Sequence, residues 1–168
     1  HDALPILLNK YYQGSPLAGV REVSRDGNCF FHAVEDQLNH QKILSEDGEV
    51  YTHESLRKSV LEYVQAHPEL LEFYTNTDLL DLEKLGGWVG HETIQALSNQ
   101  LQLEIHIERT DGEPKETIIP AKEPGKKVKG KIHLTYDGSH YNSVRLRSRT
   151  EQAITWGSWL QTKFSMFL

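Results

Sequence analysis

The sequence has very little cysteine. Cys29 stands alone among 168 residues, so no internal disulfide can form and the chain carries one free thiol. A free thiol keeps its reduced form best in a reducing compartment. We therefore expect an intracellular protein of the cytoplasm or nucleus, or of a host cytoplasm if the chain is an effector.

Long apolar runs and an excess of positive charge are also missing. No stretch approaches the roughly 18–20 apolar residues of a membrane-spanning helix, and the N-terminal residues show neither an initiator methionine nor a signal-peptide pattern. We expect no membrane contact and interpret the chain as a domain of a longer protein. The formal net charge of −6 disfavours nucleic acid as the main partner, because phosphate binding relies on clustered lysine and arginine.

Lysines do gather in the segment 120–131, but no aromatic residue stands between them there. Single-stranded nucleic acid is usually bound by basic residues interleaved with aromatic ones, on which the bases stack. We therefore interpret this segment as a solvated hairpin loop.

What is present is an ordinary globular composition, with 38% hydrophobic and 25% charged residues. The length of 168 residues predicts a single domain over 1–168, with a core at about 20–147, a flanking arm over 1–19 and a C-terminal helix over 150–168. We favour core packing for the aromatic side chains of that helix over contact with another protein or a membrane surface. One cysteine and scattered histidines give no cluster of metal ligands, so we expect neither a metal nor an organic cofactor.

The periodicity of apolar residues places helices first and strands second. It predicts one helix that begins at Cys29, a second with its N-cap at Thr52, shorter helical turns between Leu70 and Leu85, and a helix over Glu92–Leu101. Apolar and polar residues then alternate over Leu103–Ile107, which is typical of a half-buried strand. Further strands are predicted over 117–119, 131–136 and 141–146. This order predicts an α+β fold, with helices packed on a mostly antiparallel sheet.

Cys29 is a candidate nucleophile. Thiol chemistry needs a thiolate, and a free cysteine with a pKa of about 8.5 is mostly protonated at neutral pH. The N-terminus of a helix and a nearby imidazolium both lower that pKa. Cys29 opens a predicted helix directly after the turn Asp26-Gly27-Asn28, and such a turn aims backbone N–H groups at one point, as an oxyanion hole requires.

Cys29 also admits a plainer interpretation. A buried structural cysteine is commoner than a catalytic one, although a structural cysteine has no need of this turn before it. The residues around Cys29 alone leave both interpretations open.

His140 is the best placed of the nine histidines to act as a general base. It lies in a tight turn between two predicted strands, which would hold it in place while leaving it accessible. Asn142 follows two residues later, so in a strand it projects to the same side as His140. Its amide oxygen can accept from the imidazole and fix the tautomer, the third role in a Cys-His-Asn system. A solvated turn histidine is the plainer interpretation.

Three segments of the sequence together resemble the ovarian tumour (OTU) family of deubiquitinating cysteine proteases. Asp26–Phe31 is similar to the family's cysteine motif, Trp88–Ser98 to its Trp-Gly-rich turn and following helix, and Ser139–Val144 to its histidine motif. They occur in the family's order, and the resemblance covers about residues 20–147. One departure is that Gly86-Gly87 precedes the tryptophan here and does not follow it.

The resemblance implies a papain-like OTU fold and a catalytic mechanism. Cys29 would attack the carbonyl of the C-terminal glycine of ubiquitin in an isopeptide bond. His140 would take the thiol proton and later hand it to the leaving lysine amine. Asp26 is often assigned to the active centre in this family, whereas Asn142 is the more direct candidate for orienting His140.

The resemblance also implies how the substrate is held. The backbone of Gly27, Asn28 and Cys29 would bind the oxyanion. Tyr141 would flank the narrow channel that admits a Gly-Gly tail.

The sequence thus predicts a deubiquitinase whose partner is ubiquitin or polyubiquitin, acting without a metal or cofactor. A protease for a ubiquitin-like modifier is one alternative, and a ubiquitin-binding pseudoenzyme is another. The intact Cys29, His140 and Asn142 speak against the pseudoenzyme. A general papain-like peptidase fits less well, because the set of three segments is OTU-like.

Overall fold

The computed structural model describes residues 17–146 of the chain. The chain divides into two compact units. One is Glu22–Ser143, and the other consists of the segments on either side, of which Leu17–Arg21 and Val144–Leu146 are described. The helix predicted for 150–168 lies outside the described residues, as does the predicted arm 1–19 up to residue 16. The prediction of a single domain over 1–168 stays a prediction.

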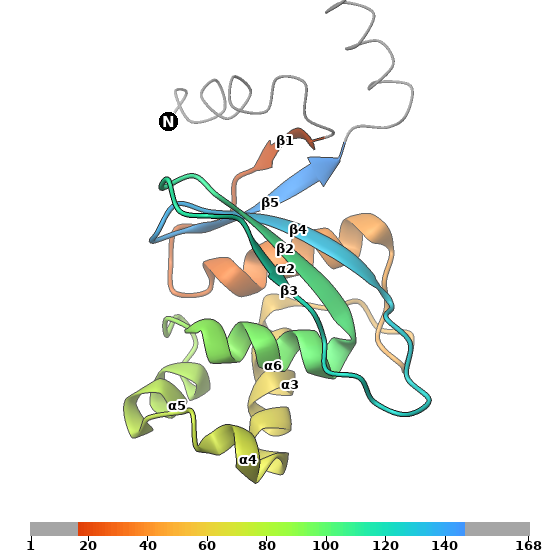
Figure 1. Ribbon diagram of the computed structural model, residues 1–168, viewed down its shortest axis with the longest axis vertical. Coiled ribbons are helices and arrows are strands. Elements are labelled where there is room, and N and C mark those ends of the chain that lie inside the picture. The colour runs from red at the N-terminus through yellow and green to blue at the C-terminus, as the bar shows by residue number, and fades with distance from the viewer. Residues whose placement is uncertain (1–16, 147–168) are drawn as a thin grey trace, which may run out of the picture. The chain divides into compact units, whose positions relative to one another are not determined.

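The helices precede most of the strands, as the periodicity predicts (Figure 1). After the strand β1 (Leu17–Arg21) the chain forms α2 (Cys29–Gln41), α3 (His53–Ala66), α4 (Pro68–Leu71), α5 (Asn76–Glu83) and α6 (His91–Leu101), followed by β2 (Leu103–Arg109), β3 (Glu116–Ile118), β4 (Gly130–Tyr136) and β5 (Tyr141–Leu146). Within residues 17–146, no helix has both the length and the apolar character to cross a bilayer.

The strands form one sheet in the order β1-β5-β4-β2-β3. The pairings β2–β3 and β4–β5 are antiparallel, as predicted for most of the sheet, but the central pairing of β2 with β4 is parallel. The chain leaves β3 at one side of β2 and returns along residues 119–129 to start β4 at the other side. Such a crossover makes β4 run in the same direction as β2.

Side chains of α2 bond the first half of β4. β5 pairs with β4 over Leu134–Tyr136. Further back along β4, the His133 N–H donates to Gln37 Oε1 (2.9 Å), and Gln41 Nε2 donates to the Lys131 carbonyl (2.7 Å). Two amides of α2 therefore bond backbone groups of β4, and they tie the helix that begins with Cys29 to the sheet.

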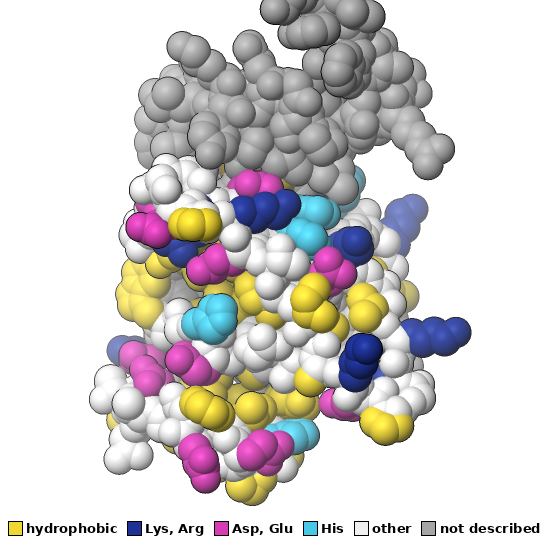
Figure 2. Space-filling model, viewed as in Figure 1, with side chains coloured by type: hydrophobic (Ala, Val, Ile, Leu, Met, Phe, Trp, Pro, Cys, Tyr) yellow, Lys and Arg dark blue, Asp and Glu magenta, His cyan; other side chains and the backbone are white. Residues whose placement is uncertain are grey.

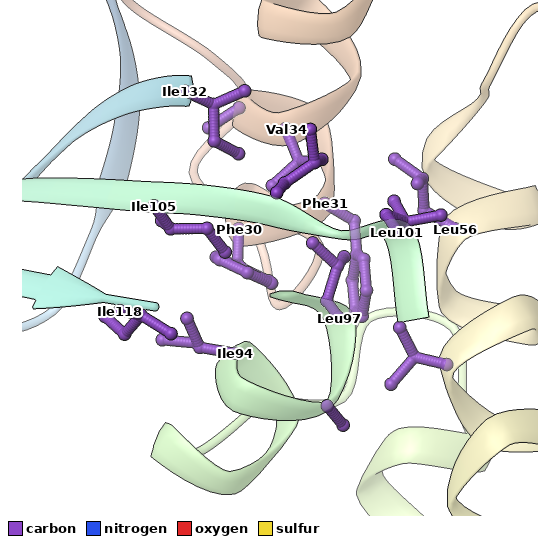
Figure 3. Packing of buried hydrophobic residues seen from close by; sticks show 14 of the residues in the cluster. Phe30, Phe31, Val34, Leu56, Ile94, Leu97, Leu101, Ile105, Ile118 and Ile132 are labelled. Carbon is purple, nitrogen blue, oxygen red and sulfur yellow. The ribbon is translucent and has the colours of Figure 1, made fainter. Parts of the chain in front are cut away.

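The core lies between α2, α3, α6 and the sheet (Figure 3). Phe30 and Phe31 of α2, Leu97 of α6 and Ile105 of β2 are all buried. The alternation predicted for β2 is confirmed, because Leu103, Ile105 and Ile107 are buried while the residues between them are partly exposed. The predicted N-cap is also confirmed: Thr52 Oγ1 accepts from the Ser55 N–H (3.0 Å).

Substituting Ile105 with alanine should destabilise the fold strongly. The side chain is fully buried in the central strand, so its removal leaves a cavity and should lower the free energy of unfolding by about 2–5 kcal/mol. Ile119→Ala is the control, because that side chain is 56% exposed and its loss should cost less than about 0.5 kcal/mol. Urea denaturation followed by circular dichroism measures both, and equal losses would contradict the assignment of the core.

Candidate active site

Cys29 begins α2 directly after the turn Asp26-Gly27-Asn28, as predicted. The turn closes on itself: the Asn28 N–H donates to Asp26 Oδ1 (2.8 Å), and the Cys29 N–H donates to the Asp26 carbonyl (3.1 Å). The Cys29 side chain is 1% exposed. The thiol is therefore held at the end of a helix and covered.

The closed turn bears on the predicted oxyanion hole. The N–H groups of Asn28 and Cys29 both donate inside the turn. They can donate to an oxyanion only after the turn changes conformation, so the oxyanion role of this backbone stays a prediction.

Gly27 is required by a close approach of two backbones. A Cβ at this position would lie 1.5 Å from the carbonyl oxygen of Gly86. The Asn28 side chain reaches the same segment, because its Oδ1 accepts from the Gly86 N–H (2.9 Å). A Cβ on Gly87 would in turn meet the Asp81 carbonyl oxygen at 1.9 Å. The Gly86-Gly87 pair thus lets the segment before Trp88 pack against the turn that carries the nucleophile.

His140 lies at the end of a turn that an aspartate holds. Asp137 Oδ1 accepts from the N–H groups of Ser139 (2.8 Å) and His140 (2.7 Å) and from the Ser139 hydroxyl (3.0 Å). Burial alone would raise the pKa of Asp137, but these hydrogen bonds outweigh it and lower that pKa. Sequence reasoning did not assign a role to Asp137, although an aspartate before Gly-Ser is a typical signal of such a turn.

Asn142 fixes the tautomer of His140. Its side-chain oxygen accepts from the Val23 N–H (2.9 Å), a group that can only donate, so this atom must be the oxygen of the amide. The same oxygen lies 2.9 Å from His140 Nε2, and an oxygen that cannot donate requires a proton on Nε2. His140 Nδ1 then carries a lone pair. It is buried and has no hydrogen-bond partner among the described residues, so it is able to accept a proton.

Tyr141 joins the two halves of the site. Its backbone N–H group lowers the pKa of the Cys29 thiol. Its ring packs edge-on against Phe30 (centroids 5.3 Å apart) and stacks on Tyr136 (4.2 Å). This packing holds the start of α2 against the strand that follows His140, whereas a role at a substrate channel stays a prediction.

Comparison with known proteins agrees with this geometry. The sequence profile of the family described as OTU-like cysteine protease matches residues 24–141. This chain belongs to the OTU family. The match runs from just before the nucleophile turn to the residue after His140, so it includes both halves of the site.

Two curated relatives illustrate the similarity. The chain is 31% identical over 131 residues to the ovarian tumor domain-containing deubiquitinating enzyme 7 of Arabidopsis thaliana, which covers 74% of this chain and 32% of that protein. It is 31% identical over 142 residues to the deubiquitinase OTUD6B of Mus musculus, covering 74% of this chain and 45% of that protein. The chain thus spans less than half the length of these relatives.

Solved structures confirm the fold. The OTU domain of OTUD1 superposes with a TM-score of 0.62 at 20% identity, covering 84% of this chain and 95% of that one. An OTU domain solved in complex with ubiquitin superposes with a TM-score of 0.56 at 22% identity, covering 80% and 78%. The papain-like OTU fold predicted from the sequence is therefore confirmed.

The electrostatics of this OTU domain differ from the simple expectation for a helix end. Burial raises the pKa of the Cys29 thiol, and the negative charges of Asp26 and Asp137 raise it further. The backbone N–H group of Tyr141 lowers it, and so does that of Phe30, as predicted for the helix N-terminus, but together they lower it by less. Since the Cys29 pKa is raised overall, the thiol needs a proton acceptor to form a thiolate at neutral pH.

Asp26 and Asn142, which sequence reasoning left as rival third residues, lie in different places. Asp26 Oδ1 holds the nucleophile turn, and its Oδ2 lies 3.9 Å from His32 Nε2. Asn142 alone of the two is bonded to the His140 ring. Asp26 thus shapes the turn, and Asn142 is placed to orient the base.

The expectation of scattered histidines without a ligand cluster is wrong at one place. His32, Glu35 and His53 offer ligand atoms within 4.8 Å of one another, because α2 packs against the start of α3. Existing contacts account for the group: Glu35 Oε2 accepts from the His53 N–H (2.7 Å) and lies 3.2 Å from its Nδ1, while the His32 and His53 rings contact each other at a tilt, with centroids 4.1 Å apart. We interpret the group as a contact between two helices.

Asp26→Asn should shift the reactivity of the thiol to lower pH. The amide keeps an oxygen to accept from the Asn28 N–H but removes a negative charge that raises the Cys29 pKa. Because only the thiolate reacts, the midpoint of alkylation by iodoacetamide should then fall below that of the wild type. Mass spectrometry of the labelled chain across pH measures it. Glu113→Gln, an exposed carboxylate outside the site, is the control, and a shift to higher pH would contradict the electrostatic assignment.

Proposed function

We propose that this chain is a deubiquitinase that hydrolyses isopeptide bonds at the C-terminus of ubiquitin through a cysteine thioester. The observation that carries the proposal is the Asn142 oxygen bonded to both Val23 and His140, because it leaves a buried lone pair on His140 Nδ1. The names of the relatives, which include deubiquitinases from a plant and a mouse, support the choice of substrate.

These positions support the following reaction. His140 Nδ1 takes the proton of Cys29, and the thiolate attacks the carbonyl carbon of the scissile bond. The imidazolium, held by Asn142, then donates that proton to the leaving lysine amine as the thioester forms. Water attacks the thioester with His140 again as base, which releases the carboxylate of ubiquitin and restores the thiol.

The burial of the thiol favours a substrate without side chains at the cleavage point. Cys29 is 1% exposed, so a peptide with bulky residues near the scissile bond would clash with the covering atoms. The Gly-Gly end of ubiquitin has no side chains and fits such a restricted approach.

An apolar surface next to the nucleophile turn suits a protein substrate. Leu85 and Trp88, on either side of the Gly86-Gly87 pair, are 60% and 61% exposed. Phe73, which follows α4, and Leu80 of α5 are also exposed. Figure 2 shows apolar side chains at the surface over α4 and α5. Exposed apolar patches commonly mark interaction sites.

A ubiquitin probe with an electrophilic C-terminus tests the proposal. It should form a covalent adduct with the wild-type chain and none with Cys29→Ala, read as a shift on a denaturing gel. A ubiquitin-like probe run in parallel tests the alternative substrate. Labelling by that probe alone would move the assignment to a ubiquitin-like modifier, and labelling by neither would favour a non-catalytic binding protein.

Variants of the base and its partner should differ in turnover of a fluorogenic ubiquitin substrate. His140→Ala removes the general base and should lower kcat by about 10²–10⁴-fold. Asn142→Ala should cost less, because the base remains although its orientation is lost. Asn142→Asp keeps an oxygen that accepts from Val23 and His140 and should stay closer to the wild type. Equal losses in the two alanine variants would show that orientation matters as much as the base itself.

A further inference from the structure

Arg57 is a buried cation that the mechanism above does not use. It lies on α3 and its side chain is 2% exposed. Its Nη2 donates to the Gly27 carbonyl (3.1 Å) and to Asn28 Oδ1 (2.9 Å), both in the turn before the nucleophile. The same nitrogen donates to the Gly87 carbonyl (2.8 Å). Nothing in the periodicity of the sequence distinguishes this arginine from an ordinary exposed helix residue.

The other end of the guanidinium holds a third segment. Nη1 donates to the carbonyls of Asp81 (3.0 Å) and Leu82 (3.3 Å), at the end of α5. The group also lies over the Phe31 ring, with 4.7 Å from Cζ to the centroid. One planar group therefore bonds three separate backbone segments and rests on the side chain two residues after Cys29.

A guanidinium suits this position for a geometric reason. It presents several N–H donors in one rigid plane, whereas a lysine ammonium is a single point on a flexible stem. A lysine would keep the charge but could not reach the nucleophile turn and the α5 carbonyls together.

Stability alone does not account for a charge here. Burying a cation is costly, and apolar replacements of buried charges are often neutral or stabilising. Burial indeed lowers the pKa of Arg57, against the opposing charges of Asp26 and Asp81. The contacts instead concentrate on the two residues before Cys29 and on the segment packed against them.

We propose that Arg57 is a positioning residue for the nucleophile: it clamps the turn Gly27-Asn28 to the Gly86-Gly87 segment and so fixes where Cys29 lies relative to His140. This rests on the proposed function for its link to turnover. The clamp itself is a property of the fold and can be measured through the thiol alone.

Two variants separate the charge from the geometry of the clamp. Arg57→Met removes both and should lower kcat on a fluorogenic ubiquitin substrate by about 100-fold, the size of effect that small misplacements produce, with KM changed much less. Arg57→Lys keeps the positive charge near Asp26. It should therefore keep the pH midpoint of Cys29 alkylation by iodoacetamide, while kcat still falls by about 10-fold or more. In Arg57→Met the alkylation midpoint should move to higher pH, because Asp26 loses its neighbouring cation.

Asn99→Ala is the matched control. Asn99 is also buried and holds a loop, since its Oδ1 accepts from the Ala121 N–H (2.8 Å), but it does not touch the nucleophile turn. It should lower the melting temperature and leave kcat within about threefold of the wild type, which a purely structural role predicts for any buried polar residue.

A double-mutant cycle keeps the proposal testable if Arg57→Met does not fold. Asn28→Ala removes one acceptor of the clamp, and the effects of Asn28→Ala and Arg57→Lys on kcat should not add, because both break the same contact. Additive effects would overturn the proposal. So would a folded Arg57→Met with wild-type kcat and an unchanged alkylation midpoint.

The two proposals fail in different ways. If the wild type does not cleave ubiquitin substrates, the proposed function is wrong and kcat can no longer be measured. The rate of Cys29 alkylation at a pH above the midpoint still decides the role of Arg57. The thiol is 1% exposed, so loss of the clamp should make it react several-fold faster in both Arg57→Met and Arg57→Lys but not in Asn99→Ala, and wild-type rates in both Arg57 variants would overturn the clamp.

Discussion

The site depends on one oxygen atom that accepts two hydrogen bonds. Asn142 Oδ1 accepts from the Val23 N–H and from His140 Nε2. Because the Val23 N–H can only donate, the Asn142 atom must be the amide oxygen, and the proton between it and the ring belongs to His140. The proton on Nε2 follows, and with it the lone pair on Nδ1. Tyr141 lies between His140 and Asn142 in the chain, and its ring packs against Phe30, the residue after Cys29. The candidate nucleophile is therefore anchored to the same short strand.

Two aspartates give rigidity to the site at an electrostatic cost. Asp26 and Asp137 each accept backbone N–H groups and so fix the turns that carry Cys29 and His140. The negative charge that makes them good acceptors also raises the pKa of the thiol between them. The domain thus holds the two turns in place with charges that oppose formation of the Cys29 thiolate.

Features that depend on residues close together in the chain could be predicted from the sequence. Cys29 after a turn, and His140 and Asn142 on one side of a strand, follow from spacings of a few residues, and the structure places them so. The parallel pairing of β2 with β4 and the bonds of Arg57 to Gly27 and Gly87 join residues about 30 positions apart in the chain. No local pattern encodes them. The contact between His32, Glu35 and His53 escaped prediction for the same reason, because it depends on how two helices pack.

The hydrogen bonds between β4 and the side chains of Gln37 and Gln41 in α2 limit where this sequence can change in length. They fasten α2 to His133 and Lys131 at fixed distances from Cys29 along the helix. An inserted or deleted residue within α2 would rotate every later position by about 100° and pull both amides away from the strand. Residues 122–128 form a mostly exposed loop outside the helices and strands. Length variation among homologues should therefore gather in that loop and be absent between Cys29 and Gln41.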